Sequence, residues 1–181
     1  QKATPVMQYS ISIPKPQSHN YHVQLQTGSW HKDTLDFKLP QWMPGYYQLM
    51  NYAADIENIT ARMQQGNTIS VIKINNNTWR LTGIKNKTFV IDYNINTKKK
   101  FVANSYVDSA HAYLVATNSF LYADGYLKMP VSVKVELPRQ WNKIATGLTA
   151  LQYKTNTFFA ADFDELYDCP MLIGNLEQLP S

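Results

Sequence analysis

Four histidines are the side chains in this sequence that could bind a metal ion: His19, His22, His31 and His111. A zinc site of the H-E-x-x-H type needs a helix, because two imidazoles must share one face beside a glutamate base. The sequence contains no such motif. His19 and His22 are three positions apart at a predicted loop-to-strand junction, where side chains at i and i+3 point to opposite faces. We therefore expect the histidines to be exposed polar residues and predict no metal site in this chain.

Recognisable nucleophile motifs and phosphate-binding loops are also absent from the sequence. It has no G-x-S-x-G motif, and its seven glycines form neither G-x-G-x-x-G nor a P-loop. Cys169 is the single cysteine, which excludes an intrachain disulfide and a four-cysteine zinc site. We expect Cys169 to be a small, partly buried side chain. This chain alone is therefore predicted to have no catalytic activity and no cofactor.

Acidic residues gather near the C-terminal end, at Asp162, Asp164, Glu165 and Asp168. Paired carboxylates could serve glycoside hydrolysis or bind calcium, but the spacing and central glycine of an EF-hand are missing. A short helix with Asp162 or Asp164 as its N-cap explains these residues more simply.

The composition predicts a folded chain without a nucleic-acid partner. Hydrophobic residues make up 44% of the 181 residues, so one domain over 1–181 can bury a core. The net charge is +4, but the lysines are dispersed and the only run is 98–100, which we expect to be a solvated turn. Phosphate neutralisation needs a concentrated basic face. No apolar stretch approaches the roughly 18 residues of a membrane span.

Apolar and polar residues alternate with a period of two, which indicates strands with one buried face. Proline, glycine and asparagine clusters separate the strands, as turn chemistry requires. The fold class is therefore all-β, a β-sandwich or saddle-like curved antiparallel sheets with one or two short helical turns. Helical turns are expected within 46–58 and 162–168, and a strand, a loop and a strand within 104–124. The clearest alternation runs over 8–13, 21–26, 35–39, 89–96 and 131–137.

An aromatic stretch follows the third of these strands. Trp42 stands before a predicted type II turn, in which Pro44 fixes φ and Gly45 takes the positive φ. Tyr46 and Tyr47 come next and add amphipathic contact area. One interpretation is a core corner with Trp42 buried against the turn, and the other is a rigid aromatic loop presented to a ligand or a partner.

The same stretch resembles a known protein family. Together with other segments in matching order, it is similar to the N-terminal domain of the glycyl aminopeptidase family, the PDZ-containing gluzincin metallopeptidases of peptidase family M61. The matching segments include W-M-P-G-Y-Y at 42–47, G-N-T-I at 66–69, V-I-D-Y at 90–93, N-S-F-L-Y at 118–122, L-P-R-Q-W at 137–141, A-T-G-L at 145–148 and D-F-D-E-L-Y-D-C-P at 162–170.

The resemblance implies a non-catalytic first domain of a zinc metallo-aminopeptidase that releases N-terminal glycine or alanine. The zinc ion, the catalytic domain and the PDZ domain would lie outside this chain. Its partners would be the catalytic domain in cis and, through the parent enzyme, a peptide substrate. The implied contact residues at the substrate cleft or domain interface are Trp42, Pro44, Gly45, Tyr46, Tyr47, Asp164, Asp168 and Pro170. Asp168 is the acid that we expect to mark a boundary or hold a substrate ammonium, although a cap of the last turn is a plainer role.

Two features limit what the resemblance implies. Many relatives have serine after the Pro-Gly pair and an arginine further on, where this sequence has Tyr46 and Met50, so no role of that arginine carries over. The start Gln1-Lys2-Ala3 suggests a mature N-terminus after leader removal, so we expect an exported periplasmic, cell-surface or secreted protein. The alternatives are a free-standing carbohydrate-binding module, with four tryptophans and twelve tyrosines as a stacking platform, and an adhesin-like module that pairs through a sheet edge.

Overall fold

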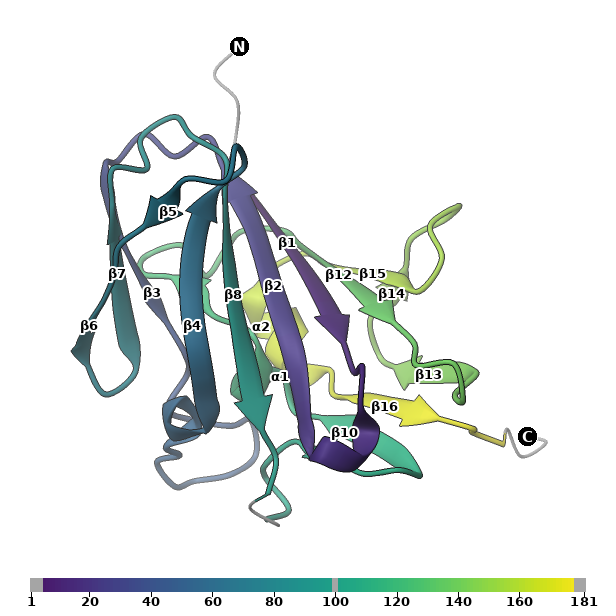
Figure 1. Ribbon diagram of the computed structural model, residues 1–181. Helices are drawn as coiled ribbons and strands as arrows, with labels where there is room; N and C mark the ends of the chain where they lie inside the picture. Colours follow the sequence, from purple (N-terminus) through teal and green to yellow (C-terminus); the bar gives the residue numbers. More distant parts are fainter. Residues whose placement is uncertain (1–4, 99–100, 178–181) are drawn as a thin grey trace.

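In a computed structural model of the chain, residues 5–98 and 101–177 are described, and their strands form three sheets around a shared hydrophobic core (Figure 1). The predicted mature start at 1–3 and two lysines of the predicted turn at 98–100 lie outside the described residues. The all-β fold class is confirmed. Among the described residues, no helix is long and apolar enough to cross a membrane.

The largest sheet has eight strands in the order β14-β15-β12-β1-β2-β8-β4-β5. Its pairs are antiparallel except β1 with β12, which are parallel and join residues far apart in sequence. The five predicted alternating runs all form strands, four of them in this sheet. The strands are β1 (Val6–Ser12), β2 (Asn20–Gly28), β4 (Ile56–Met63), β5 (Thr68–Ile69), β8 (Phe89–Asn96), β12 (Val131–Glu136), β14 (Thr149–Ala150) and β15 (Thr157–Ala160).

Two four-stranded sheets complete the fold. The first has the order β11-β3-β7-β6 and the second the order β13-β16-β10-β9. Their strands are β3 (Thr34–Lys38), β6 (Val71–Asn75), β7 (Thr78–Thr82), β9 (Tyr106–Val107), β10 (His111–Leu114), β11 (Tyr122–Ala123), β13 (Lys143–Thr146) and β16 (Met171–Gly174).

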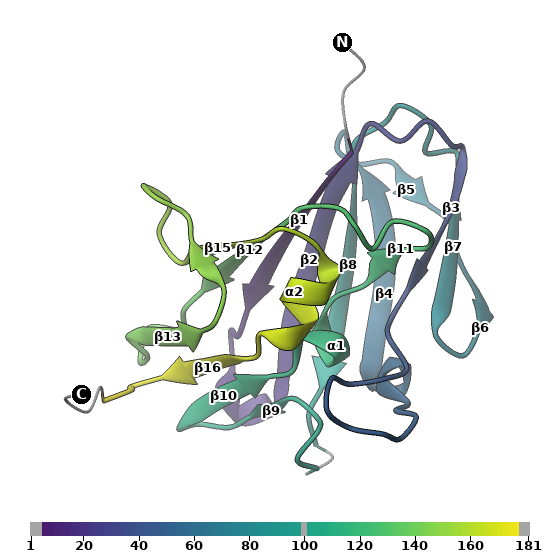
Figure 2. The ribbon, with the colours of Figure 1, turned by 180° about the vertical axis from the view of Figure 1, so that it is seen from behind.

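Two short helices, α1 (Ala116–Ser119) and α2 (Phe163–Asp168), lie against the inner face of the eight-stranded sheet (Figure 2). Buried tyrosines of the sheet hold the segment that follows α1. Tyr9 donates its hydroxyl to the carbonyl of Leu121, and Tyr93 donates to the carbonyl of Ser119. Burial raises the pKa of both phenols. These neutral hydroxyls therefore satisfy one backbone carbonyl at the end of α1 and one just after it.

The helical expectation over 46–58 was wrong for most of its length. Only a 3-10 turn, η2 (Tyr52–Asp55), forms there. A second 3-10 turn, η1 (Pro16–Ser18), lies between β1 and β2. From Ile56 the chain pairs with β8 instead, with a register shift between Glu57 and Thr60. Sheet pairing thus overrides a weak helical spacing. Within 104–124 the strands were expected, but α1 was missed because its four residues are too few for a periodic signal.

Candidate functional site

The aromatic loop, residues 40–51, connects β3 to the turn before β4. Its tip is a type II turn, because Tyr46 donates its backbone N–H to the carbonyl of Met43 at 3.1 Å and Gly45 has φ +76°. At its base, Met50 donates its N–H to the carbonyl of Gln41 at 2.9 Å. The predicted roles of Pro44 and Gly45 are confirmed, and the two hydrogen bonds give the loop a defined shape.

The loop presents large apolar side chains to solvent. Tyr47 and Leu49 have relative exposures of 102% and 87%, and Trp42 of 44%. The interpretation of a core corner with a buried Trp42 is therefore wrong. The indole of Trp42 packs edge-to-face on Tyr167 of α2, with 6.0 Å between the ring centroids.

A second aromatic segment lies beside the loop. Phe101 packs edge-to-face on Tyr46 with 5.8 Å between centroids, and Phe101 and Val102 are 46% and 81% exposed. With Asn104, Tyr106 and Tyr113 they line an open hollow of about 500 Å³. The sequence analysis missed Phe101 and Val102; the available signal was an apolar pair directly after a lysine run, where a solvated turn would be polar throughout.

A buried carboxylate ties these two segments together. Asp55 is 4% exposed and ends the turn that follows the aromatic loop. Its Oδ2 accepts from the side-chain amides of Asn104 at 2.9 Å and Asn118 at 3.2 Å. Tyr52 also donates its hydroxyl to the carbonyl of Ala103 at 2.7 Å. The residues after the loop and those after Phe101 are thus joined in the interior, which fixes the positions of the exposed rings.

The acidic cluster is explained by α2. Asp162 is its N-cap and accepts from the N–H of Glu165 at 3.0 Å. This bond, and then the ammonium of Lys128, lower the pKa of Asp162. Asp164 is exposed and pairs with the same lysine at 2.5 Å. The cluster is therefore a capped helix start with a surface ion pair.

Asp168 and Pro170 are exposed at the other end of α2. Asp168 is the last helical residue, where a negative charge opposes the helix dipole, so the alternative role of a cap is wrong. Within the described part of the chain, its carboxylate has no hydrogen bond or ion pair. Because Trp42 packs on the adjacent Tyr167, the predicted contact residues of the loop and of α2 form neighbouring parts of one surface.

No metal centre is formed by these side chains. Across residues 5–98 and 101–177, no group of three or more His, Cys, Asp or Glu residues could hold an ion. His19 and His22 are partly buried rather than exposed, and they contact different partners: the carbonyl of Val107 for the first, Asp92 and Asn94 for the second.

Cys169 is the partly buried side chain that the sequence predicted, and burial raises the pKa of its thiol. Its Sγ lies 3.0 Å from the point where a Cβ on Gly147 would stand. The thiol thus packs against Gly147, and its raised pKa disfavours the thiolate that a nucleophile needs.

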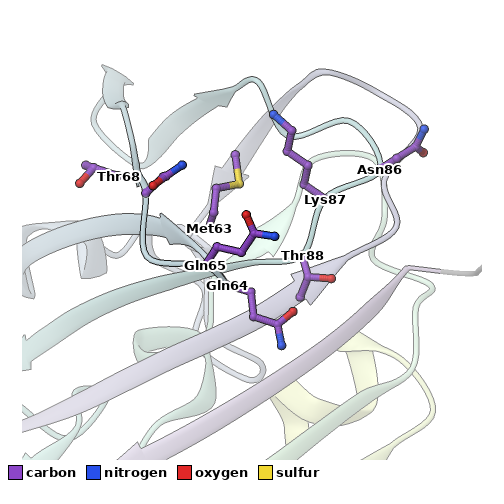
Figure 3. Close-up of a pocket in the computed structure, with 8 residues that line it drawn as sticks. Met63, Gln64, Gln65, Thr68, Asn86, Lys87 and Thr88 are labelled. Carbon is purple, nitrogen blue, oxygen red and sulfur yellow. The ribbon is translucent and has the colours of Figure 1, made fainter.

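A further hollow, of about 540 Å³, lies beside the end of β4 (Figure 3), whereas the aromatic loop lies near the start of that strand (Figure 1). Its lining is rich in amides and hydroxyls, and its one basic group, Lys87, donates to the carbonyl of Gly83 at 2.8 Å. This lining lacks an acid, a nucleophile or an aromatic ring. The lining residues are Met63, Gln64, Gln65, Asn67, Thr68, Asn86, Lys87 and Thr88.

The tryptophans do not form the stacking platform of a carbohydrate-binding module. Trp30, Trp79 and Trp141 are 1%, 3% and 5% exposed, so Trp42 alone offers a face to solvent. Coplanar exposed rings, which the carbohydrate hypothesis required, are therefore not available from these four residues.

The described residues thus define a β domain with an exposed aromatic surface. The chain matches the family described as the peptidase M61 N-terminal domain over residues 8–175, and it belongs to that family. The comparison with curated proteins gave no significant match.

Two solved structures share the fold. An aminopeptidase N family protein from Idiomarina loihiensis is 25% identical, with a TM-score of 0.85; the match covers 95% of this chain and 30% of that one. A variant of the M1 zinc metallopeptidase from Deinococcus radiodurans is 12% identical, with a TM-score of 0.50, and the match covers 93% of this chain and 41% of that one. The chain therefore spans less than half the length of either structure, and the second likeness shows the fold alone.

Proposed function

We propose that this domain is the non-catalytic N-terminal part of an exported zinc metallo-aminopeptidase that releases N-terminal glycine or alanine. One observation carries the proposal: a peptidase N-terminal family matches 8–175, and the domain occupies only 30% of a solved aminopeptidase N family relative. The described residues do not fit a zinc site, so the ion would be held by a separate catalytic domain.

The domain would pack on that catalytic domain and shape its substrate cleft. Trp42, Tyr46 and Tyr47 are suited to form part of the wall, because rigid aromatic rings give contact area at low entropic cost. Asp168 is suited to hold a substrate ammonium through a charge-assisted hydrogen bond, since its carboxylate is exposed beside Tyr167. Asp164 lies in the first turn of the same helix, and Pro170 follows its other end.

The reading frame around this chain provides the test. Downstream of the Ser181 codon we expect an H-E-x-x-H motif within the next domain, and upstream we expect a secretion leader. The complete protein should hydrolyse glycyl and alanyl p-nitroanilides, and a zinc chelator should abolish that activity. A control without the glutamate of the motif should be inactive yet folded. A complete protein that holds no zinc, or that spares both substrates, contradicts the proposal.

A further inference from the structure

The four-stranded sheet that contains β16 carries an apolar row of side chains across its outer face, next to a row that contains His111 and Lys143. The pairing register places Leu172 opposite Ala145 on one side and Tyr113 on the other, and Tyr113 opposite Tyr106. Tyr106, Tyr113 and Leu172 alternate with buried residues along their strands, and Ala145 is exposed between half-buried neighbours, so the four side chains share the outer face. We call them the apolar row.

Two open hollows extend the apolar row at its ends. At the β9 end, Tyr106 and Tyr113 share a hollow with Phe101 and Val102, and Phe101 contacts Tyr46 of the aromatic loop. At the β13 end, a hollow of about 510 Å³ is lined by Lys143, Ala145, Leu172, Asn175, Leu176 and Glu177. The apolar row therefore connects to the aromatic loop at the β9 end, and at the β13 end it meets a mixed hollow that also contains Lys143 and Glu177.

This surface holds most of the large hydrophobic side chains that the described residues expose. Antiparallel sheets in water alternate apolar and polar faces, and contiguous exposed apolar patches mark contact sites. Aromatic residues are also enriched in the cores of protein interfaces. The exposed side chains on this surface are Trp42, Tyr47, Leu49, Phe101, Val102 and Leu172.

We propose that the apolar row and the aromatic loop together bind the catalytic domain that follows β16 in the same polypeptide. This inference rests on the proposed function and adds the surface that makes the contact. The occupant follows from where the chain leaves the fold: β16 is itself an inner strand of this sheet, so the chain leaves beside the apolar row, while the aromatic loop lies on the other side of the lower half of the molecule (Figures 1 and 2).

The covalent connection through β16 favours the catalytic domain over a separate partner protein as the group that binds this surface. A domain that continues from Glu177 starts within reach of Leu172 and Ala145, so its effective concentration at the surface is high. The solved relative has room for such a domain, since 70% of its length lies outside the match that covers 30% of it. The buried contacts of Asp55 hold the two aromatic segments in place before docking, which lowers the entropic cost of binding.

Hydroxyl-radical footprinting of the 181-residue chain and of the complete protein tests the inference. The chain offers matched controls on the eight-stranded sheet: Phe159 is as exposed as Leu172, at 37%, and Tyr153 is 95% exposed against 102% for Tyr47. We expect oxidation of Leu172, Tyr47 and neighbouring rings to fall by about fivefold in the complete protein, because interface cores exclude water. Oxidation of Phe159 and Tyr153 should stay unchanged.

A pair of variants of the complete protein adds a second measurement. Leu172→Glu should raise oxidation of Tyr113 by about threefold, since a charge in an apolar contact weakens docking. Phe159→Glu should leave Tyr113 protected.

Equal oxidation of the surface in the short chain and the complete protein would overturn the inference, and so would a frame that ends at Ser181. Protection within the short chain that rises with its concentration would assign the surface to a second copy and also overturn it. If the complete protein has aminopeptidase activity but its surface is not protected from oxidation, this inference is wrong and the proposed function stands. If the surface is protected but the protein is inactive, docking is supported and only the proposed function is contradicted.

Discussion

Phe159 and Leu172 are equally exposed, at 37%, yet their direct neighbours across the strands differ in character. Phe159 lies between Ser132 and Thr149 on the outer face of the eight-stranded sheet. Leu172 lies between Ala145 and Tyr113 on the outer face of the sheet that contains β16. Exposure alone therefore does not distinguish the two residues, and their neighbours across the strands do.

The two faces also differ in what supports them. On the eight-stranded sheet, the half-buried Asp92 contacts His22, Gln24 and Arg62, and the side chains of His22 and Arg62 are 35% and 46% exposed, so water can replace Asp92 as their partner. Beneath the aromatic loop, the contacts of Asp55 are buried. A polar cluster on the surface thus contributes little to position, whereas a buried one fixes the segments that it joins.

The largest expected effect on stability comes from removing the buried hydrogen bonds of Asp55. Asp55→Ala leaves the buried amides of Asn104 and Asn118 without their acceptor, so we expect a loss of about 3 kcal/mol in the free energy of unfolding. Asp92→Ala should cost about 1 kcal/mol or less, because its partners can bind water. Urea denaturation of both variants checks the comparison. Equal losses would mean that the two acids have the same role.

A smaller effect concerns the turn between β9 and β10. Hydrogen bonds from the hydroxyl of Tyr106 and the N–H groups of His111 and Ala110 lower the pKa of Asp108 to about 2. A depressed carboxyl pKa stabilises the fold above the unfolded pKa of 3.8, and this contribution is lost as the pH falls towards 2.

Asp108→Asn should therefore lower the free energy of unfolding by about 1 kcal/mol at pH 7, with a smaller difference at pH 2. Denaturation of both proteins across this pH range measures the difference between their free energies of unfolding. The titration of all other groups cancels in this difference. A gap that does not change with pH would show that the charge of Asp108 does not support the turn.

The smallest effect sharpens the contrast between the two faces. Leu172→Gln and Phe159→Gln should each change the free energy of unfolding by about 0.5 kcal/mol or less, because both side chains are partly in solvent. Only Leu172→Gln should reduce the fluorescence of a hydrophobic dye bound to the isolated chain, since Phe159 has polar neighbours. Equal dye binding in both variants would argue against a contiguous apolar surface.

The sequence alone determined the local features of this protein. A period of two defined the strands and their buried faces, because side-chain direction in a strand depends only on position along it. The Pro44-Gly45 pair defined a type II turn, and the spacing from Asp162 to Glu165 defined a helix start. In each case the physical cause acts within a few residues, so the sequence pattern contains it.

Only the tertiary structure decided which distant residues meet. The apolar row joins Tyr106, Tyr113, Ala145 and Leu172 through the register of four strands, and no local pattern specifies that register. Asp55 likewise finds Asn104 and Asn118 through packing of segments about 50 and 60 residues away. The candidate contact surface is therefore a property of strand pairing, while the elements that carry it are a property of sequence.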